Sequence, residues 1–99
     1  GPSEIMIIAD DSANPEHVAL DCIAQLEHDP MSIAVVLTTS KELAERVEEI
    51  AKGYGVNSDS LKIAVVEDVE KAIEVANRFA PEHLSLMFRR AEDYVEKIE

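Results

Sequence analysis

The sequence predicts an α/β domain with a four-stranded parallel sheet and helices on both of its faces. Short apolar runs without polar alternation recur along the 99 residues, as is typical of strands buried on both faces. Each run is followed by a stretch in which apolar residues recur at helical spacing. Strand and helix alternate four times in succession, and such alternation gives a parallel sheet rather than hairpins.

The first half of the chain contains a strand, a helix and a second strand. Ile5–Ala9 is continuously apolar and predicts a central strand. Asn14 is a favourable N-cap and Pro15 suits the first helical position, so residues 15–28 are predicted to form a helix that stops before Pro30. Ile33–Leu37 is the next apolar run and predicts the second strand.

The middle of the chain repeats this pattern. Ser40 is expected to cap a helix whose apolar stripe faces the core and which ends at Gly53 and Gly55. The outer face of this helix carries glutamates and is expected to be solvated. Ile63–Val66 predicts the third strand. Residues 53–61 form the one loop-like stretch, which is too short for a domain linker.

The last part of the chain is expected to contain a helix, a strand and a final amphipathic helix. Asp68 should cap a helix whose inward residues are Val69, Ala72, Ile73, Ala76 and Phe79. Leu84–Phe88 contains Ser85 within its apolar run and is placed at a sheet edge. The final helix should bury Ala91, Tyr94, Val95 and Ile98. Right-handed crossovers make 2-1-3-4 the simplest strand order, which is a flavodoxin-like or Rossmann-like three-layer domain.

Composition limits the partners and the compartment. The formal net charge of -12 argues against binding to nucleic acid or to an anionic membrane. No apolar run is long enough to span a bilayer. Cys22 is the single cysteine, so no internal disulfide forms, and a reducing cytoplasm is the expected location. Its apolar neighbours predict a core position. We expect one domain over residues 1–99, and the short lead into the first strand suggests a fragment of a larger protein.

The loop after the first strand carries two acids, Asp10 and Asp11. It lacks a glycine-rich phosphate loop, so a nucleotide site within the chain is not expected. One interpretation is a solvated loop before a helix N-terminus, where acids are favourable by about 0.3–1 kcal/mol. The alternative is a magnesium-binding pair, as in response-regulator receiver domains, which would make the chain a non-enzymatic signalling module. The sequence around the third and fourth strands lacks the other receiver residues, and we prefer the first interpretation.

Other polar residues are predicted to gather at the opposite edge, where strands begin and helices end. Gln25 and His28 lie at i and i+3 and share a helix face near its end. Imidazole is a common zinc ligand and an amide oxygen a rarer one, but two ligands do not complete a zinc site, so for these two residues alone we prefer the interpretation of a polar helix end. Glu82 and His83 form an adjacent acid–base dyad just before the fourth strand. Ser3 precedes the first strand, and His17 is expected to be merely exposed.

Five blocks of the sequence resemble histidinol dehydrogenases, and the likeness runs over essentially the whole chain. The last two blocks are highly specific. The blocks are Gly1–Glu4, Ile8–Asp10, Ala13–Pro15, Ala24–Pro30 and Ala76–Leu84. The resemblance implies a zinc-dependent, homodimeric enzyme of histidine biosynthesis that oxidises L-histidinol to L-histidine and reduces two NAD.

The resemblance also implies roles for individual residues. Gln25 and His28 would be zinc ligands and, with Ser3 and His83, would contact the substrate. Glu82 and His83 would be the catalytic acid–base pair. The remaining zinc ligands and the NAD-binding residues of the family have no counterpart here, and the connection between Glu49 and Ile63 is shorter than usual in the family.

This comparison leaves the activity of the chain itself open. We expect an excised α/β domain that folds but is inactive alone and binds neither zinc nor NAD firmly. Its partners would be the remainder of the parent enzyme, the second subunit and L-histidinol. An engineered folding scaffold cut from the enzyme is a further alternative to the receiver-like module.

Overall fold

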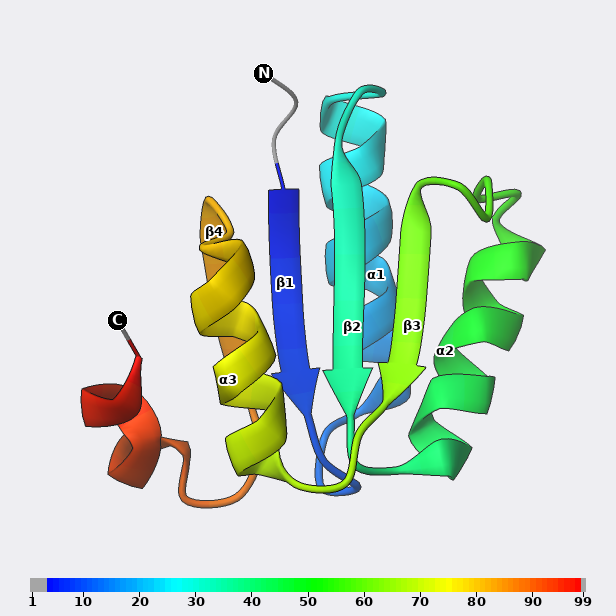
Figure 1. Ribbon diagram of the computed structural model, residues 1–99. Coiled ribbons are helices and arrows are strands. Elements are labelled where there is room, and N and C mark those ends of the chain that lie inside the picture. The colour runs from blue at the N-terminus through cyan, green and yellow to red at the C-terminus, as the bar shows by residue number, and fades with distance from the viewer. Residues whose placement is uncertain (1–3, 99) are drawn as a thin grey trace.

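The computed structural model describes residues 4–98, which form one parallel sheet with helices on both faces (Figure 1). The strands are β1 (Glu4–Ala9), β2 (Ile33–Thr38), β3 (Leu61–Val65) and β4 (His83–Met87). Their order in the sheet is β3-β2-β1-β4 and every neighbouring pair is parallel. The predicted fold class is confirmed, whereas the predicted order 2-1-3-4 is wrong.

The position of β3 explains the difference in strand order. The order 2-1-3-4 would place β3 in the interior of the sheet, covered on both faces. Lys62 lies within β3 and is exposed, as is Ala64. A charged side chain in mid-strand is a mark of an edge strand. The predicted strand began at Ile63 and therefore left Lys62 out, and with it the strongest indication of an edge.

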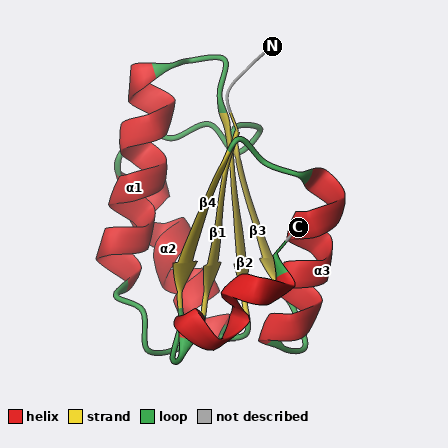
Figure 2. Ribbon diagram, turned by 90° about the vertical axis from the view of Figure 1, so that its left-hand side faces the viewer, coloured by secondary structure: helices red, strands yellow, loops and turns green. Residues whose placement is uncertain are grey.

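Two helices cover one face of the sheet, and a third helix with a short 3₁₀ helix covers the other (Figure 2). Helices α1 (Pro15–His28) and α2 (Lys41–Gly53) lie together, while α3 (Val69–Phe79) and η1 (Ala91–Lys97) lie opposite. Right-handed crossovers account for this division. The chain runs outward from β1 to β3 through α1 and α2, and then returns past β1 to β4 through α3.

The helix starts follow the predicted capping residues. The Asn14 side-chain oxygen accepts a hydrogen bond from the Glu16 backbone N–H at 2.8 Å. Ser40 Oγ accepts from the Leu43 N–H at 3.1 Å, and Asp68 Oδ1 accepts from the Lys71 N–H at 2.7 Å. Each bond satisfies a backbone donor that the helix itself leaves unpaired, so the capping predictions are confirmed.

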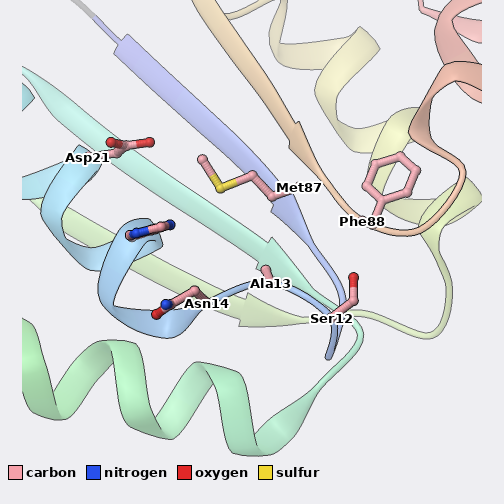
Figure 3. Close-up of a pocket in the computed structure, with 7 residues that line it drawn as sticks. Ser12, Ala13, Asn14, Asp21, Met87 and Phe88 are labelled. Carbon is pink, nitrogen blue, oxygen red and sulfur yellow. The ribbon is translucent and has the colours of Figure 1, made fainter.

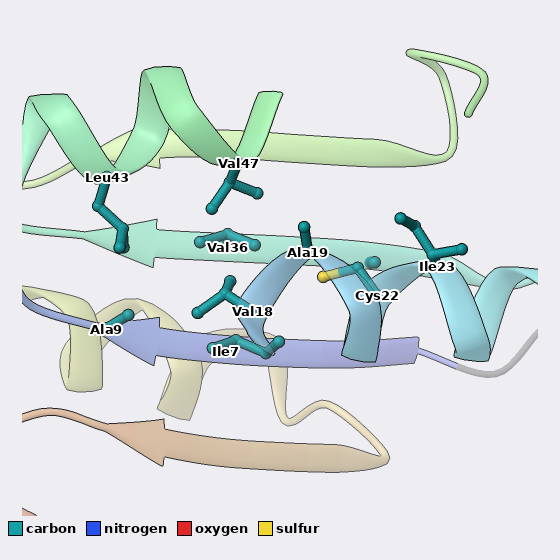
Figure 4. Packing of buried hydrophobic residues seen from close by; sticks show 10 residues of the cluster. Ile7, Ala9, Val18, Ala19, Cys22, Ile23, Val36, Leu43 and Val47 are labelled. Carbon is teal, nitrogen blue, oxygen red and sulfur yellow. The ribbon is translucent and has the colours of Figure 1, made fainter. Parts of the chain in front are cut away.

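The core consists of two apolar clusters, one on each face of the sheet. Figure 4 shows the cluster between the sheet and helices α1 and α2, where Val18 and Cys22 pack over Ile7 and Val36. The second cluster joins alternate residues of β1 to α3 and to Phe88. Cys22 is fully buried, as predicted. Burial, and secondarily the charge of Asp21, raise the pKa of its thiol to about 12.

Two predictions about buried residues in the last third of the chain are wrong. Phe79 is 68% exposed, because α3 buries Ala72, Ile73 and Ala76 and Phe79 is its final residue. The last segment is a 3₁₀ helix in which Val95 is 58% exposed, whereas Ala91, Tyr94 and Ile98 are partly buried against the cluster under α3 as predicted. The edge position predicted for the fourth strand is confirmed. Across residues 4–98, no helix is long and apolar enough to span a membrane.

Candidate functional site

The candidate site lies at the end of the sheet where the strands begin. Helix α1 runs antiparallel to the strands, so its last turn lies at this end, beside the starts of β1 and β2 (Figure 1). Gln25 and His28 belong to that last turn, and the chain then passes through a short loop into β2. The structure therefore places this pair at the edge predicted for it.

The side chain of Gln25 is held by a buried hydroxyl group. Gln25 is half-buried, and its Nε2 donates a hydrogen bond to Ser32 Oγ at 3.3 Å. Ser32 is 2% exposed. This contact uses the nitrogen of the amide and leaves its oxygen, which is the atom suited to a cation, available to bind one. His28 is exposed at the end of the helix.

Glu82 and His83 follow a sharp change of chain direction after α3. Ala80 adopts the left-handed conformation with φ 46°, and its N–H donates to the Ala76 carbonyl at 2.8 Å. Pro81 then prevents the helix from continuing. Glu82 is exposed and precedes β4. His83 was also predicted to precede this strand, but it is the first residue of the strand.

Strand register places His83 on the same face of the sheet as α1. His83 is paired with Ile5 of β1. Met87 packs against the cluster under α1 and α2, whereas Leu84 and Leu86 pack against the cluster under α3. Because side chains alternate along a strand, His83 lies on the Met87 side. Topology thus brings Gln25, His28, Glu82 and His83 to one end of the sheet. Ser3, the fifth predicted residue, lies outside the described residues.

The donor chemistry at this edge fits part of a zinc site. An imidazole from His28 and the free amide oxygen of Gln25 are both acceptable zinc donors. Within residues 4–98, no group of three or more His, Cys, Asp or Glu side chains is arranged to hold a metal ion. Structural and catalytic zinc sites use three or four protein ligands, so further donors would have to come from elsewhere.

The opposite end of the sheet is built around Asp10, which the sequence analysis had assigned to a solvated loop. Asp10 is 9% exposed, so that assignment is wrong for it, whereas the Asp11 side chain is 67% exposed. Asp10 Oδ1 accepts from the N–H and hydroxyl of Ser12, and Oδ2 accepts from the Arg89 N–H at 3.1 Å. The Arg89 guanidinium contacts both aspartates. Arg89 lies two residues after the end of β4 and 79 residues from Asp10 in sequence, so no local pattern indicated this contact.

These contacts determine the ionisation of Asp10. Burial by itself raises the pKa of a carboxyl group. The hydrogen bonds from Ser12 and the Arg89 backbone, together with the Arg89 charge, outweigh burial and lower the pKa of Asp10 below 3.8. A carboxylate whose two oxygens are engaged in this way is poorly suited to bind magnesium, which argues against the receiver-like alternative.

A pocket with a volume of about 430 Å³ lies between the start of α1 and the end of β4 (Figure 3). Asp21 lines it from the helix, and Met87 and Phe88 line it from the end of the strand. His17, exposed as predicted, completes the helix side. The pocket is at the far end of α1 from Gln25 and His28, so it is separate from the edge that carries the candidate residues.

The fold and this edge define a parallel α/β domain that presents a Glu–His pair beside an amide and an imidazole. Comparison with known proteins gives the family. The family model for histidinol dehydrogenase matches residues 1–99. A histidinol dehydrogenase of Archaeoglobus fulgidus is 49% identical over 98 residues, and one of Methanopyrus kandleri is 42% identical over 112 residues. The chain belongs to the histidinol dehydrogenase family.

A solved structure agrees with this assignment. The crystal structure of histidinol dehydrogenase from Elizabethkingia anophelis matches with a TM-score of 0.91 and 33% identity, covering 100% of this chain and 25% of that one. The two curated relatives are likewise covered over 24% and 26% of their lengths. The chain therefore spans about a quarter of the length of the histidinol dehydrogenases it matches.

Proposed function

We propose that this chain is one domain of a histidinol dehydrogenase and supplies part of the active site for the NAD-linked oxidation of L-histidinol to L-histidine. The observation that carries the proposal is the meeting of Gln25, His28, Glu82 and His83 at one end of the sheet in a chain of this family. These residues come from two segments far apart in the sequence, and no core-packing requirement explains the exposure of His28, Glu82 and His83.

His83 is proposed as the base for the two oxidation steps. Its position at the start of an edge strand leaves the imidazole exposed, and imidazole is the side chain most often used to accept or donate a proton in catalysis. When a hydride passes from the substrate carbon to NAD, the alcohol proton would move to the imidazole. After the imidazole has released this proton to solvent, it would accept the proton of the aldehyde hydrate in the second step, while the hydride of the hydrate reduces a second NAD.

Glu82 is proposed to activate water between those steps. A carboxylate beside the aldehyde-level intermediate can accept a proton from water while the water oxygen attacks the carbonyl carbon. Glu82 is exposed and adjacent to His83, so the two side chains can act on the same substrate carbon in turn. The order of events then requires no other acid or base from this chain.

Gln25 and His28 are proposed to hold zinc through the amide oxygen and the imidazole, and Ser3 to contact the substrate. Bound zinc would supply a fixed positive centre that anchors the nitrogen atoms of the substrate. The amide of Gln25 is oriented for this purpose by its bond to Ser32. The other zinc ligands and the NAD-binding residues would come from the rest of the enzyme and from a second subunit, so the 99-residue chain alone is expected to be inactive. We propose the cytoplasm as its location.

The test is a chimera in which this chain replaces the matching quarter of the Archaeoglobus fulgidus enzyme. We expect histidinol-dependent NAD reduction by the chimera, and losses of about 10²–10⁴-fold in kcat for His83→Asn and Glu82→Gln. His17→Asn is the matched control, because His17 is also an exposed histidine of the domain but lies at the opposite end of α1. Full activity of both His83→Asn and Glu82→Gln would disprove the assignment.

Zinc content tests the proposed ligands separately. His28→Asn and Gln25→Ala are expected to lower the zinc retained by the purified chimera after dialysis, whereas His17→Asn and His83→Asn should retain it. An inactive His28→Asn chimera with full zinc content would exclude His28 as a ligand. Activity alone cannot give this result, so the two measurements are made on the same samples.

A further inference from the structure

Strand β4 is hydrogen-bonded to fewer neighbouring strands than β1 or β2. It lies at an edge and is hydrogen-bonded to β1 alone. Its register pairs His83 with Ile5 and Met87 with Ala9. Since β4 carries His83 at its first position, the register of this one strand pair decides where the imidazole lies.

A one-residue slip of β4 would be enough to misplace His83. Shifting the register of a strand by one residue moves every side chain to the other face of the sheet. In the observed register, Met87 and His83 lie on the α1 face, while Leu84 and Leu86 face α3. The slipped strand would turn His83 away from the face on which α1 carries Gln25 and His28.

Asp10 is hydrogen-bonded to the chain at the C-terminal end of β4. Its backbone N–H donates to the Met87 carbonyl at 3.3 Å and so extends the strand ladder by one bond. Its carboxylate accepts from the Arg89 N–H at 3.1 Å and from Arg89 Nη1 at 3.4 Å. The other carboxylate oxygen is held by Ser12, so Asp10 joins the loop after β1 to the first residues after β4. Figure 3 shows Ser12 in the loop after β1, and Met87 and Phe88 near the end of β4.

We propose that Asp10 is a positioning residue for the reaction: its buried carboxylate fixes the register of β4 against β1 and thereby holds His83 on the α1 face. The inference rests on the proposed role of His83. Asp10 lies at the opposite end of the strand pair from His83 and contacts neither Glu82 nor His83, so it acts through the strand. The main-chain N–H of Arg89 makes the shorter of the two bonds to Oδ2, so the backbone two residues beyond the end of β4 is tied directly.

The first test uses the Archaeoglobus fulgidus chimera. Asp10→Asn keeps the shape of the side chain but replaces one acceptor oxygen by an amide group, which repels the donors of Ser12 or Arg89. We expect kcat to fall at least tenfold, on the order of a misplaced catalytic group. Zinc content should be unchanged, because Gln25 and His28 belong to α1. A kcat equal to that of the parent chimera would overturn the proposal.

Ser40→Ala is the control for simple loss of stability. Ser40 caps α2 and is buried, but α2 packs mainly on β2 and β3 rather than on the strand that carries His83. It should lower the unfolding temperature without lowering kcat. If Ser40→Ala reduces kcat as much as Asp10→Asn does, a general loss of stability explains the effect and the positioning role is disproved. Activity retained by His83→Asn would instead disprove the proposed function, so the two failures are distinguishable.

The second test observes the register in the 99-residue chain itself. In amide hydrogen exchange, Asp10→Asn should accelerate exchange in β4 at least tenfold more than in β2, and the nuclear Overhauser contacts between Ile5 and His83 should weaken. Ser40→Ala should not produce this difference between the strands. Unchanged Ile5–His83 contacts and uniform exchange in Asp10→Asn would overturn the proposal without any reference to catalysis.

Discussion

The two ends of the sheet carry similar polar residues but differ in how far these side chains are buried and hydrogen-bonded. At the carboxyl end, both oxygens of Asp10 are hydrogen-bonded and most of the side chain is buried. At the amino end, the side chains of His28, Glu82 and His83 form no hydrogen bond or ion pair with any other residue of the described part of the chain. One end satisfies its own polar groups, and the other leaves them available to a ligand or to the rest of the enzyme.

This contrast predicts a large stability cost for removing Asp10. Asp10→Ala leaves the Ser12 and Arg89 donors without their acceptor at a site of low exposure. We expect a loss of about 2 kcal/mol of unfolding free energy, since hydrogen bonds to a charged group contribute roughly 1.5–3 kcal/mol. Urea unfolding measures this. Asp11→Ala, an exposed neighbour on the same loop, should cost less than about 0.5 kcal/mol. Equal losses for the two variants would show that burial at this end confers no advantage.

The low pKa of Asp10 predicts that its contribution depends on pH. The pKa is lower in the folded chain than the ordinary 3.8, so the unfolded chain binds more protons in that range. The contribution is therefore complete above the ordinary pKa and is lost as the pH falls through the folded pKa. The stability difference between the parent chain and Asp10→Asn should be constant from pH 7 to about pH 5. It should then shrink as the solution is acidified, and a constant difference down to pH 2 would contradict this reading.

A smaller effect is expected at the turn that leads into the amino end. Ala80 adopts the left-handed conformation, with φ 46°, immediately before Pro81. For residues with a Cβ this conformation costs roughly 1–2 kcal/mol, and glycine avoids that cost. Ala80→Gly should therefore stabilise the chain by about 1 kcal/mol, partly offset by the entropy of glycine in the unfolded state. Thermal unfolding of Ala80→Gly against Ala24→Gly, an exposed alanine within helix α1, separates the two contributions.

The smallest effects on stability are expected at the open end itself. Glu82→Gln and His83→Asn remove no hydrogen bond within the described residues, so each should change the unfolding free energy by less than about 0.5 kcal/mol. The same substitutions carry the largest predicted losses of activity in the chimera. A loss of more than about 1 kcal/mol for His83→Asn would mean that this end also stabilises the fold, and the contrast between the two ends would fail.

Particular residues show how far sequence reasoning reaches in this fold. Asn14, Ser40 and Asp68 were predicted as caps, because capping is decided by neighbours two or three residues away. The strand order was missed because it depends on which strand tolerates an uncovered face, and the predicted third strand began at Ile63 and left out Lys62.

The candidate site shows the same division. Gln25, His28, Glu82 and His83 were found from residue type and topology. The burial of Asp10 was missed, because its partner Arg89 is 79 residues away in sequence and no local pattern joins them.

Cys22 gives the chain an internal reporter of opening. Its thiol is fully buried between α1 and the sheet, and its pKa of about 12 leaves almost no thiolate at neutral pH. A disulfide reagent in excess should thus label it only during moments when α1 separates from the strands. Labelling rates would report how often this layer of the domain detaches, on a helix that also carries Gln25 and His28. Because the sequence has one cysteine, every labelled molecule records the same event.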